Sequence, residues 1–482
     1  MGHKPPAIVW FRRDLRLADH LALRAACRLG PVVPVYLHTP DLDAAWRAGA
    51  ASNWWLHHSL LSLRETLRSR GSELVLRKGR DPLPLLRRLA RETGANAVRW
   101  NAVPDPAARR HDAELCAALE QDGLTVEIHE AALLFEPNLI RNKQDRPFQV
   151  FTPFWRHCLE SLSPEPPAAA PGDIPAPGRF PDGENVDALD LLPAIDWAAG
   201  FRDTWEPGEQ GALKVLRRFI RSGLESYDTD RDRPDREGTS RLSPHLHFGE
   251  ISVRQVWQAV EQAAAGRPPA RKAALVYQRE LGWREFAHHL LEHFPRTPEE
   301  PLHPEFGRFP WRRDKAILKA WQKGLTGYPI VDAGMRELWR TGWMHNRVRM
   351  IVASFLVKDL LLPWQEGARW FWDTLLDADL ANNTLGWQWS AGCGADAAPY
   401  FRIFNPVLQA AKFDPGGEYI RRWVPELKAL PAPWLFKPWE AEPLELQAAG
   451  VVLGQTYPRP VVDHSEARDR ALAAYAGMKN PG

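Results

Sequence analysis

The chain has 482 residues, which is too many for one hydrophobic core, so two domains are expected. It is 44% hydrophobic and 25% charged, as ordinary globular proteins are, and its net charge of +2 favours no class of partner. No apolar run approaches the length of a membrane span, and the four cysteines show no CxxC spacing. These features argue against a membrane protein, a disulfide framework and a zinc site.

The N-terminal sequence MGHKPPAIVWFRRDLRL contains no apolar signal core, because charge begins at Arg12. With the scattered cysteines, this favours a reducing, intracellular environment, and we expect a cytoplasmic protein. The 22 tryptophans indicate either a large aromatic core or rings with stacking or electronic roles.

Strand and helix patterns alternate over residues 1–130, which predicts an α/β domain with a doubly wound parallel sheet. The expected strands are 7–11, 32–38, 73–79, 97–101 and 125–130, and the expected helices are 20–30, which ends in a glycine cap, 53–71, 82–94 and 107–123. No G-x-G-x-x-G follows any of these strands, so a dinucleotide held in the usual Rossmann manner is not expected here.

Residues 131–204 are expected to form a linker, because the stretch 163–183 is rich in proline. From residue 205 to 482 the apolar residues recur with helical periodicity, which predicts an all-helical second domain. The clearest helical patterns cover residues 211–227, 271–294, 315–324, 331–342 and 345–361.

The loop REGTSRLSPHLHFGEIS (236–252) brings hydroxyls and a guanidinium together before a proline, which suits a phosphate or pyrophosphate. A plain helix start, with Ser243 as N-cap and Pro244 as first residue, explains the same pattern, and both interpretations stay open. Glu280 and Arg284 have the spacing of a helical ion pair, an alternative to any catalytic role for Glu280.

Histidines 288, 289 and 293, and the pair 245 and 247, are interpreted as solvated side chains, because no third ligand is evident and no metal is expected. The stretch DLANNTLGWQWSAG (379–392) is harder to interpret. Adjacent asparagines do not favour a packed helix, and Trp-x-Trp does not favour a solvent loop, so we treat it as an irregular segment whose glycines let backbone approach a ligand.

Several segments together resemble the cryptochrome/photolyase family, and more closely its bacterial members that repair cyclobutane pyrimidine dimers. They run nearly from end to end of the chain: 9–23, 150–156, 237–252, 280–286, 326–338, 341–361 and 396–406. The resemblance implies an α/β domain, a long linker, and a helical domain that holds FAD in a folded form. The enzyme class it implies is a light-driven carbon–carbon lyase.

By motif, the resemblance places the phosphate side of FAD at Tyr227 and residues 239–243, the ribose and flavin side at Asp377 and Asp379, and the flavin N5 at Asn383. An ion pair between Arg349 and Asp377 is expected, and plant cryptochromes carry an acid at the Asn383 position. The full set of implied FAD-binding residues is Tyr227, Thr239, Ser240, Arg241, Leu242, Ser243, Tyr277, Arg349, Asp377, Asp379 and Asn383.

In such enzymes the excited reduced FAD gives an electron to the dimer. The dimer is first flipped out of the duplex, as in other enzymes that act on bases. Glu280 is expected to hydrogen-bond the pyrimidine edge, between aromatic walls formed by Trp283 and Trp389. The implied catalytic residues are Glu280, Asn383, Trp283, Trp389 and Met350; the implied DNA-binding residues are Arg231, Glu280, Trp283, Asn346, Arg347, Trp389 and Arg402.

The resemblance further implies that Trp387, Trp364 and Trp311 relay electrons to oxidised flavin. Asn346 and Met350 stand where (6-4) photolyases carry paired histidines, which favours the cyclobutane dimer over the alternative lesion. An antenna chromophore, folate or deazaflavin, is expected in the α/β domain, although residues 104–112 lack the Asn-Glu pair of well-known folate binders. A monomeric repair enzyme on DNA is expected, with a blue-light receptor of the cryptochrome kind as the alternative.

Overall fold

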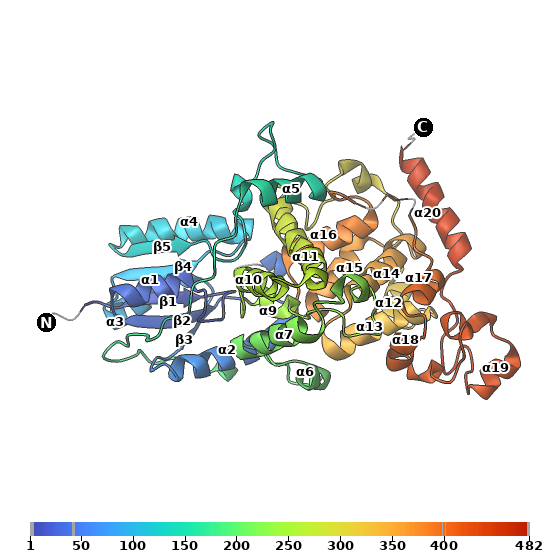
Figure 1. Cartoon of the computed structure of the whole chain (residues 1–482), viewed down its shortest axis with the longest axis horizontal. Helices are drawn as coiled ribbons and strands as arrows, with labels where there is room; N and C mark the ends of the chain where they lie inside the picture. The colour runs from blue at the N-terminus through green and yellow to red at the C-terminus, as the bar shows by residue number, and fades with distance from the viewer. Residues whose placement is uncertain (1–3, 41–43, 398, 401, 480–482) are drawn as a thin grey trace.

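The computed structural model describes residues 4–40, 44–397, 399–400 and 402–479. It has an α/β part at the N-terminal end and a larger helical part beyond it, with the C-terminal helix lying along the far end (Figure 1). Among the helices described, none is both long enough and apolar enough to cross a membrane.

The five strands of the N-terminal part form one parallel sheet in the order β3-β2-β1-β4-β5. Their bounds are Ala7–Phe11 (β1), Val32–His38 (β2), Val75–Lys78 (β3), Ala97–Asn101 (β4) and Thr125–His129 (β5). The central strands β1 and β4 are buried along their whole length, which explains their continuous apolar sequences. The predicted doubly wound sheet is confirmed.

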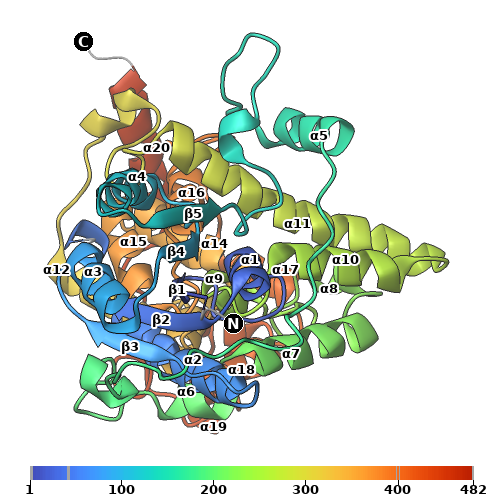
Figure 2. The same cartoon turned by 90° about the vertical axis from the view of Figure 1, so that its left-hand side faces the viewer.

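Helices cover both faces of this sheet (Figure 2). Side chains of α1 (Leu21–Leu29) and α2 (Ala50–Arg68) share a core with Val9 and Phe11, whereas α3 (Pro82–Thr93) and α4 (Pro106–Gln121) pack around Ile8 and Trp10. The alternation of β1 side chains between the two cores follows from the two-residue period of a strand. Gly30 ends α1 as predicted, but its φ of 168° is extended rather than left-handed.

Residues 131–204 are less of a plain linker than the sequence indicates. Stretch 163–183 does lack helix and strand, but α5 (Phe151–Ser161) and α6 (Ala199–Thr204) lie on either side of it. Helix α5 buries Phe151, Phe154 and Trp155 in a core shared with the helical part. A Cβ on Gly282 would lie 2.6 Å from the Trp155 ring, so α11 and α5 pack closely because residue 282 has no side chain.

From residue 205 onward the described chain is helical, apart from an isolated bridge between Leu453 and Tyr457. This confirms the all-helical prediction. The helices are α7 (Glu209–Ser222), α8 (Tyr227–Asp230), α9 (Ser243–His247), α10 (Val253–Ala264), α11 (Pro268–His293), α12 (Lys315–Gln322), α13 (Pro329–Thr341), α14 (Asn346–Ser354), α15 (Trp364–Thr374), α16 (Leu380–Ala391), α17 (Pro406–Phe413), α18 (Glu418–Trp423), α19 (Pro443–Ala448) and α20 (His464–Lys479).

Two predicted helices are interrupted. The pattern at 211–227 divides into α7 and α8, with Gly223 at the end of α7. The pattern at 345–361 begins as α14 and continues from Phe355 to Asp359 as a π-helix. The sequence does not reveal the π-helix because every one of its residues is buried, so no apolar face marks a shift in the helical phase.

Residues 380–391 form helix α16, so the interpretation of this stretch as irregular is wrong. Asp379 is its N-cap and accepts hydrogen bonds from the backbone N–H and the side-chain amide of Asn382, at 2.9 and 2.6 Å. Gly392 ends the helix with a φ of 79°. A Cβ at Gly386 would meet no atom of the described chain within 4 Å, so packing within the protein does not require glycine there.

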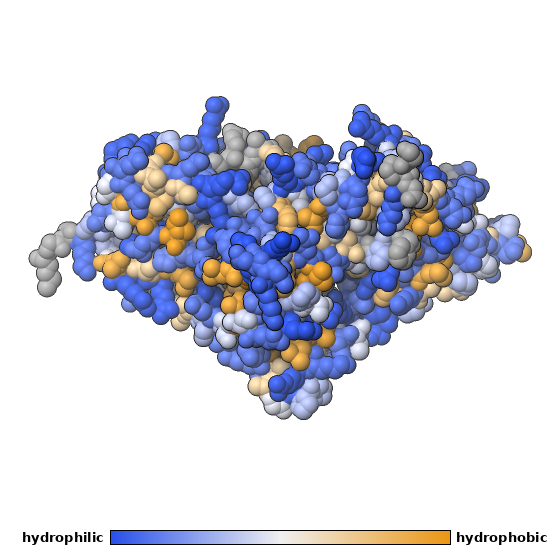
Figure 3. Space-filling view, turned by 90° about the horizontal axis from the view of Figure 1, so that it is seen from above, coloured by the Kyte–Doolittle hydropathy of each residue, from blue (hydrophilic) through white to orange (hydrophobic). Residues whose placement is uncertain are grey.

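Buried polar contacts join the α/β part to the helical part. Trp55 of α2 donates its indole N–H to Glu250 at 2.9 Å, and the guanidinium of Arg254 in α10 binds the carboxylate of Asp19. The face in Figure 3 is mostly hydrophilic, with small hydrophobic patches between hydrophilic residues. The two parts therefore meet through an ordered, buried interface rather than a loose tether.

Candidate active site

Four helices of the second domain bring the predicted cofactor residues together. Helix α11 packs against α8 and α16, and α14 packs against α16. Helix α14 and the segment that precedes α16 thereby place Arg349 and Asp377 in contact, with Nη2 of the arginine 2.8 Å from Oδ2 of the aspartate. The predicted ion pair is present.

The segment 239–243 is anchored by aromatic side chains. Tyr277 of α11 donates its hydroxyl to Ser240 Oγ at 3.0 Å, and Trp343 Nε1 donates to Ser243 Oγ at 3.2 Å. The guanidinium of Arg241 lies 4.7 Å from the Trp343 ring, and its backbone has a φ of 55°. The left-handed backbone at a residue with a side chain indicates that the segment is held in a defined shape by its surroundings.

The start of helix α9 shows that the alternative interpretation of this segment, with Ser243 as the N-cap, is wrong. Helix α9 begins at Ser243, its N-cap residue is Leu242, and no side chain caps it. Ser243 is therefore inside the helix rather than its N-cap. Tyr227, predicted at the phosphate side, packs edge-on against Tyr277 at 5.1 Å, and both rings are buried.

Asp377, Asp379 and Asn383 have distinct environments. The Oδ1 atom of Asp377 is buried without a hydrogen-bond partner in the described chain. Burial alone would raise the pKa of Asp379, but His288, His247 and Arg284 hold it well below its ordinary value, so this carboxylate is charged. Asn383 uses its amide N–H on the carbonyl of Ala368 at 3.0 Å, which leaves its oxygen as an acceptor.

These groups fit FAD. Hydroxyls and backbone N–H groups of 239–243 can bind the diphosphate, and Arg241 supplies positive charge. The buried, unpartnered oxygen of Asp377 can accept a ribose or ribityl hydroxyl. The oxygen of Asn383 can accept a hydrogen bond from the N5 proton of reduced flavin without adding charge.

The predicted lesion residues lie on α11, α14 and α16. Glu280 and Trp283 are on α11, Asn346 and Met350 are one turn apart on α14, and Trp389 is on α16. All five are partly or largely exposed. Trp283 stacks on Phe151 of α5, with ring centroids 3.8 Å apart and planes 9° from parallel. Sequence reasoning missed Phe151, although it stands within the family motif at 150–156.

Glu280 does not pair with Arg284. Its Oε1 accepts from Nη1 of Arg231 at 2.6 Å, whereas Arg284 binds Glu285 and the carbonyl of Ala132. The helical ion pair offered as the alternative for Glu280 is therefore wrong. Burial raises the pKa of Glu285 to about 7 despite the adjacent guanidinium.

Trp387, Trp364 and Trp311 belong to one hydrophobic cluster, in which Trp387 and Trp364 are buried and Trp311 is partly buried at its border. None of the ring contacts among the described residues joins the three directly. Trp387 instead contacts Phe371 at 5.0 Å and Trp321 at 6.2 Å. A Cβ on Gly367 would lie 2.0 Å from the Trp387 ring, so α15 packs directly on this indole.

The interpretation of the histidines as solvated is wrong for most of them. His245, His288 and His289 are buried, and burial lowers the pKa of His288 to about 4 and of His289 to about 3. His289 Nε2 accepts from the backbone N–H of Phe148 at 3.0 Å. Within the described residues no group of three or more potential ligands could hold a metal ion.

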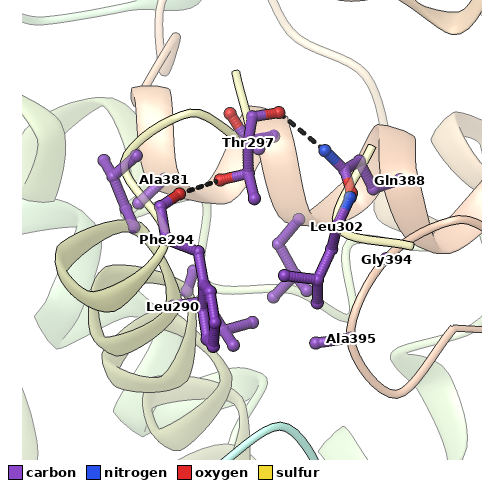
Figure 4. Close-up of a pocket in the computed structure, with 12 residues that line it drawn as sticks. Leu290, Phe294, Thr297, Leu302, Ala381, Gln388, Gly394 and Ala395 are labelled. Atoms are coloured by element: carbon purple, nitrogen blue, oxygen red, sulfur yellow. Dashed lines mark hydrogen bonds between the residues drawn. The ribbon is translucent and has the colours of Figure 1, made fainter. Parts of the chain in front are cut away.

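A small cavity of about 20 Å³ separates α11 from α16 (Figure 4). Its lining is apolar apart from Thr297, Thr384 and Gln388, and its size is that of about one water molecule. The Gln388 amide donates to the carbonyl of Thr297 at 2.6 Å and accepts from the N–H of Leu302 at 2.9 Å. These bonds fix the loop after α11 on α16, so the cavity is a packing gap beside the site.

A larger cavity of about 630 Å³ lies between the two domains. This interdomain cavity is bordered by the carboxyl ends of β1, β2 and β3, and by Trp372 and His247 from the helical part. Parallel sheets bind ligands at such ends, especially where the strand order reverses, here between β1 and β4. Its position and volume suit a flat organic chromophore.

Comparisons with known proteins agree with this geometry. Residues 7–172 match the family described as DNA photolyase, and residues 277–477 match the FAD binding domain of DNA photolyase. A deoxyribodipyrimidine photo-lyase of Agrobacterium fabrum is 50% identical over 476 residues, covering 98% of each chain. Cryptochrome-1 of Arabidopsis thaliana is 40% identical over 487 residues, covering 98% of this chain and 70% of that protein.

Among solved structures, a bacterial class III photolyase from Agrobacterium tumefaciens superposes with a TM-score of 0.94. It is 49% identical and covers 99% of this chain, with 98% of its own chain covered. Sequence and fold therefore agree over the whole length. The chain belongs to the DNA photolyase family, and its helical domain is the FAD-binding domain of that family.

Proposed function

We propose that the protein repairs cyclobutane pyrimidine dimers in DNA with the energy of light, using reduced FAD as the electron donor. The observation that carries the proposal is the placement of Asn383 and Trp389 on α16, which packs against α11, the helix that carries Glu280 and Trp283. The cofactor residue and the lesion residues thus belong to one rigid pair of helices. The relative of Agrobacterium fabrum is named for the same reaction.

Bound in its reduced form, FAD supplies on excitation the electron that opens the cyclobutane ring and then takes it back. The protein has to place the flipped-out dimer against this donor. Trp283 and Trp389 offer aromatic faces for the pyrimidines, and Phe151 holds the far face of Trp283. Glu280 hydrogen-bonds the pyrimidine edge, and Asn383 orients the flavin through its free amide oxygen.

Phosphate contacts come from Arg231, Arg347 and Arg402. Their guanidinium groups bind the backbone without reading base sequence, so affinity depends on salt more than on sequence. Trp387, Trp364 and Trp311 restore the reduced cofactor by relaying electrons from the surface. Their membership of one hydrophobic cluster supports this role, because indole is easily oxidised among side chains.

The interdomain cavity is the site we propose for an antenna chromophore, folate or deazaflavin. Tyr36, Trp46 and Trp372 line it with aromatic rings, and Arg13 lines it with positive charge, whereas the lining cations Arg12 and Lys78 pair with Asp112 and Asp190. Aromatic faces and cations suit a planar, acidic ring system. The residues at 104–112 that depart from known folate binders lie along one edge of this cavity, so a folate would be held by other contacts.

The lesion is the cyclobutane dimer because Asn346 and Met350 occupy the positions where (6-4) enzymes carry histidines.

We place the protein in the cytoplasm, on DNA, as a monomer; its four cysteines are free thiols and its proposed substrate is chromosomal. The kinship with plant cryptochromes keeps a receptor role as the second candidate, and Asn383, where those receptors carry an acid, favours repair.

The test is repair of an oligonucleotide that contains one cyclobutane thymine dimer, incubated with reduced protein under near-UV or blue light. Recovery of thymine absorbance is expected in light and not in the dark. Recovery only on a (6-4) product would reassign the lesion. No recovery on either substrate, with FAD present in the spectrum, would favour the receptor role.

A further inference from the structure

Two arginines proposed to bind DNA phosphates are already occupied by acids in the free protein. Arg231 Nη1 lies 2.6 Å from Glu280 Oε1, and Arg347 Nη2 lies 2.8 Å from Asp232 Oδ1. The arginine side chains are 20% exposed, and those of Glu280 and Asp232 are 25% and 40% exposed. Arg402 is exposed and forms no ion pair with any residue that the structure describes.

A guanidinium paired with a carboxylate offers a passing phosphate little net charge. Each pair must open before its arginine can bind DNA, and partly buried pairs are screened by solvent less than exposed ones. Arg347 is also held in place, with its guanidinium carbon 4.4 Å from the centre of the Phe413 ring and its Nε buried without a partner in the described chain. Arg347 is thus ready to exchange partners without a large movement.

The two pairs are linked through Asp232. Asp232 follows Arg231 directly in the sequence, at the end of α8. Burial lowers the pKa of the Arg231 guanidinium, but the hydrogen bond and charge of Glu280, and then the charge of Asp232, raise it. Asp232 therefore acts on both arginines, bonding one and lying close to the other.

Only a lesion can compete for Glu280. A flipped pyrimidine presents an imide N–H, which a carboxylate accepts, whereas undamaged stacked DNA presents only phosphates at this surface. Once Glu280 turns to the dimer, Arg231 loses its partner, and the charge of Asp232, the next residue along the chain, still acts on it. Asp232 then has two arginines, so Arg347 is released to the phosphate backbone.

We propose that Asp232 is a specificity-determining residue, which withholds Arg347 from undamaged DNA and releases it when a dimer engages Glu280. The inference rests on the proposed repair function and deepens it. Discrimination against undamaged DNA thereby arises from two arginines that are unavailable there, in addition to the contacts made by the dimer itself.

The experiment measures binding of two duplexes of equal sequence, one with a single dimer, by fluorescence anisotropy over a series of salt concentrations in the dark. For Asp232→Asn we expect about 1.5- to fivefold tighter binding of undamaged DNA, since the pair with Arg347 no longer has to open first. The slope of log K against log salt should steepen by about 0.9, the value for one added phosphate contact. Binding of the dimer duplex should stay nearly unchanged.

Asp228→Asn is the matched control. Asp228 is on α8, close to Asp232 in sequence, but its carboxylate pairs with Lys272 at 2.7 Å and holds neither arginine. Its loss should change binding of both duplexes slightly and equally. Arg402→Gln should weaken both duplexes equally and lower both slopes by about 0.9, because Arg402 needs no release.

The proposal is overturned if Asp232→Asn leaves undamaged DNA unaffected, or strengthens both duplexes equally as a general charge effect would. The flavin spectrum reports whether each variant folds. If Asp232→Asn does not retain FAD, Glu280→Gln gives an independent reading, because it frees Arg231 and should also tighten undamaged DNA. Wild-type repair is scored separately, so a protein that repairs dimers but shows no effect of Asp232→Asn refutes only this inference.

Discussion

The stack of Phe151 on Trp283 gives a prediction about lesion binding. Phe151 lies at the start of α5 and is buried, and it covers one face of Trp283 at 3.8 Å with nearly parallel planes. Replacing it by leucine keeps an apolar group of similar size but removes the flat ring that fixes the indole. Trp283 should then sample other orientations before a dimer arrives.

The magnitude follows from the geometry. A stacked aromatic pair contributes about 0.5–1.5 kcal/mol beyond its buried area. If about 1 kcal/mol of that orients Trp283, Phe151→Leu should weaken binding of dimer-containing DNA about fivefold. Undamaged DNA, which does not reach Trp283, should bind as tightly as to the wild type.

The assay is equilibrium binding of the two duplexes in the dark, with denaturant unfolding measured in parallel. Phe154→Leu is the control, because Phe154 is buried on the same helix and contacts Phe286 and His289 rather than Trp283. It should reduce stability by a similar amount and leave dimer affinity unchanged. Equal losses of dimer affinity in the two variants, or none in Phe151→Leu, would refute the reasoning.

Two further predictions concern the relay and the buried histidines. Trp311→Phe should abolish photoreduction of oxidised flavin while pre-reduced enzyme keeps nearly full repair; an equal fall in repair would show that Trp311 is not part of the relay. His289 has a folded pKa of about 3, below its unfolded value near 6.5, so its contribution to stability is present above pH 6.5 and lost as pH falls. His289→Gln keeps an acceptor for the Phe148 N–H and cannot be protonated. The unfolding free energy of the wild type relative to this variant should therefore fall by about 2 kcal/mol between pH 6.5 and 4.5, with a slope that approaches about 1.4 kcal/mol per pH unit at the lower end; a constant difference would contradict the assignment.

The sheet was predictable because burial on both faces leaves a simple signal, continuous apolar strands separated by helical periods. Helix α16 was not. Its asparagines lie in the first turns, where Asp379 accepts from Asn382, and its tryptophans face different neighbours. Adjacent asparagines and a Trp-x-Trp pair suggest an irregular segment, but here they belong to a capped helix whose faces meet different neighbours.

The site was partly readable from motifs, which placed Arg349 beside Asp377 correctly. The sequence did not predict which charged side chains pair with each other. Glu280 and Arg284 have ideal helical spacing, yet Glu280 pairs with Arg231 from α8 and Arg284 with Glu285. Long flexible side chains choose among several neighbours in three dimensions, and spacing along one helix specifies only some of them.

Helix α5 bears on how the protein can be dissected. A fragment starting at residue 205 would match the predicted second domain, but it would lack Phe151, Phe154 and Trp155, which fill the core around α10 and α11. Such a fragment would expose that apolar surface and aggregate, even though it keeps all the residues predicted to bind the flavin. The smallest autonomous flavin-binding piece has to include α5, so the functional border of the domain lies upstream of the proline-rich stretch and not after it.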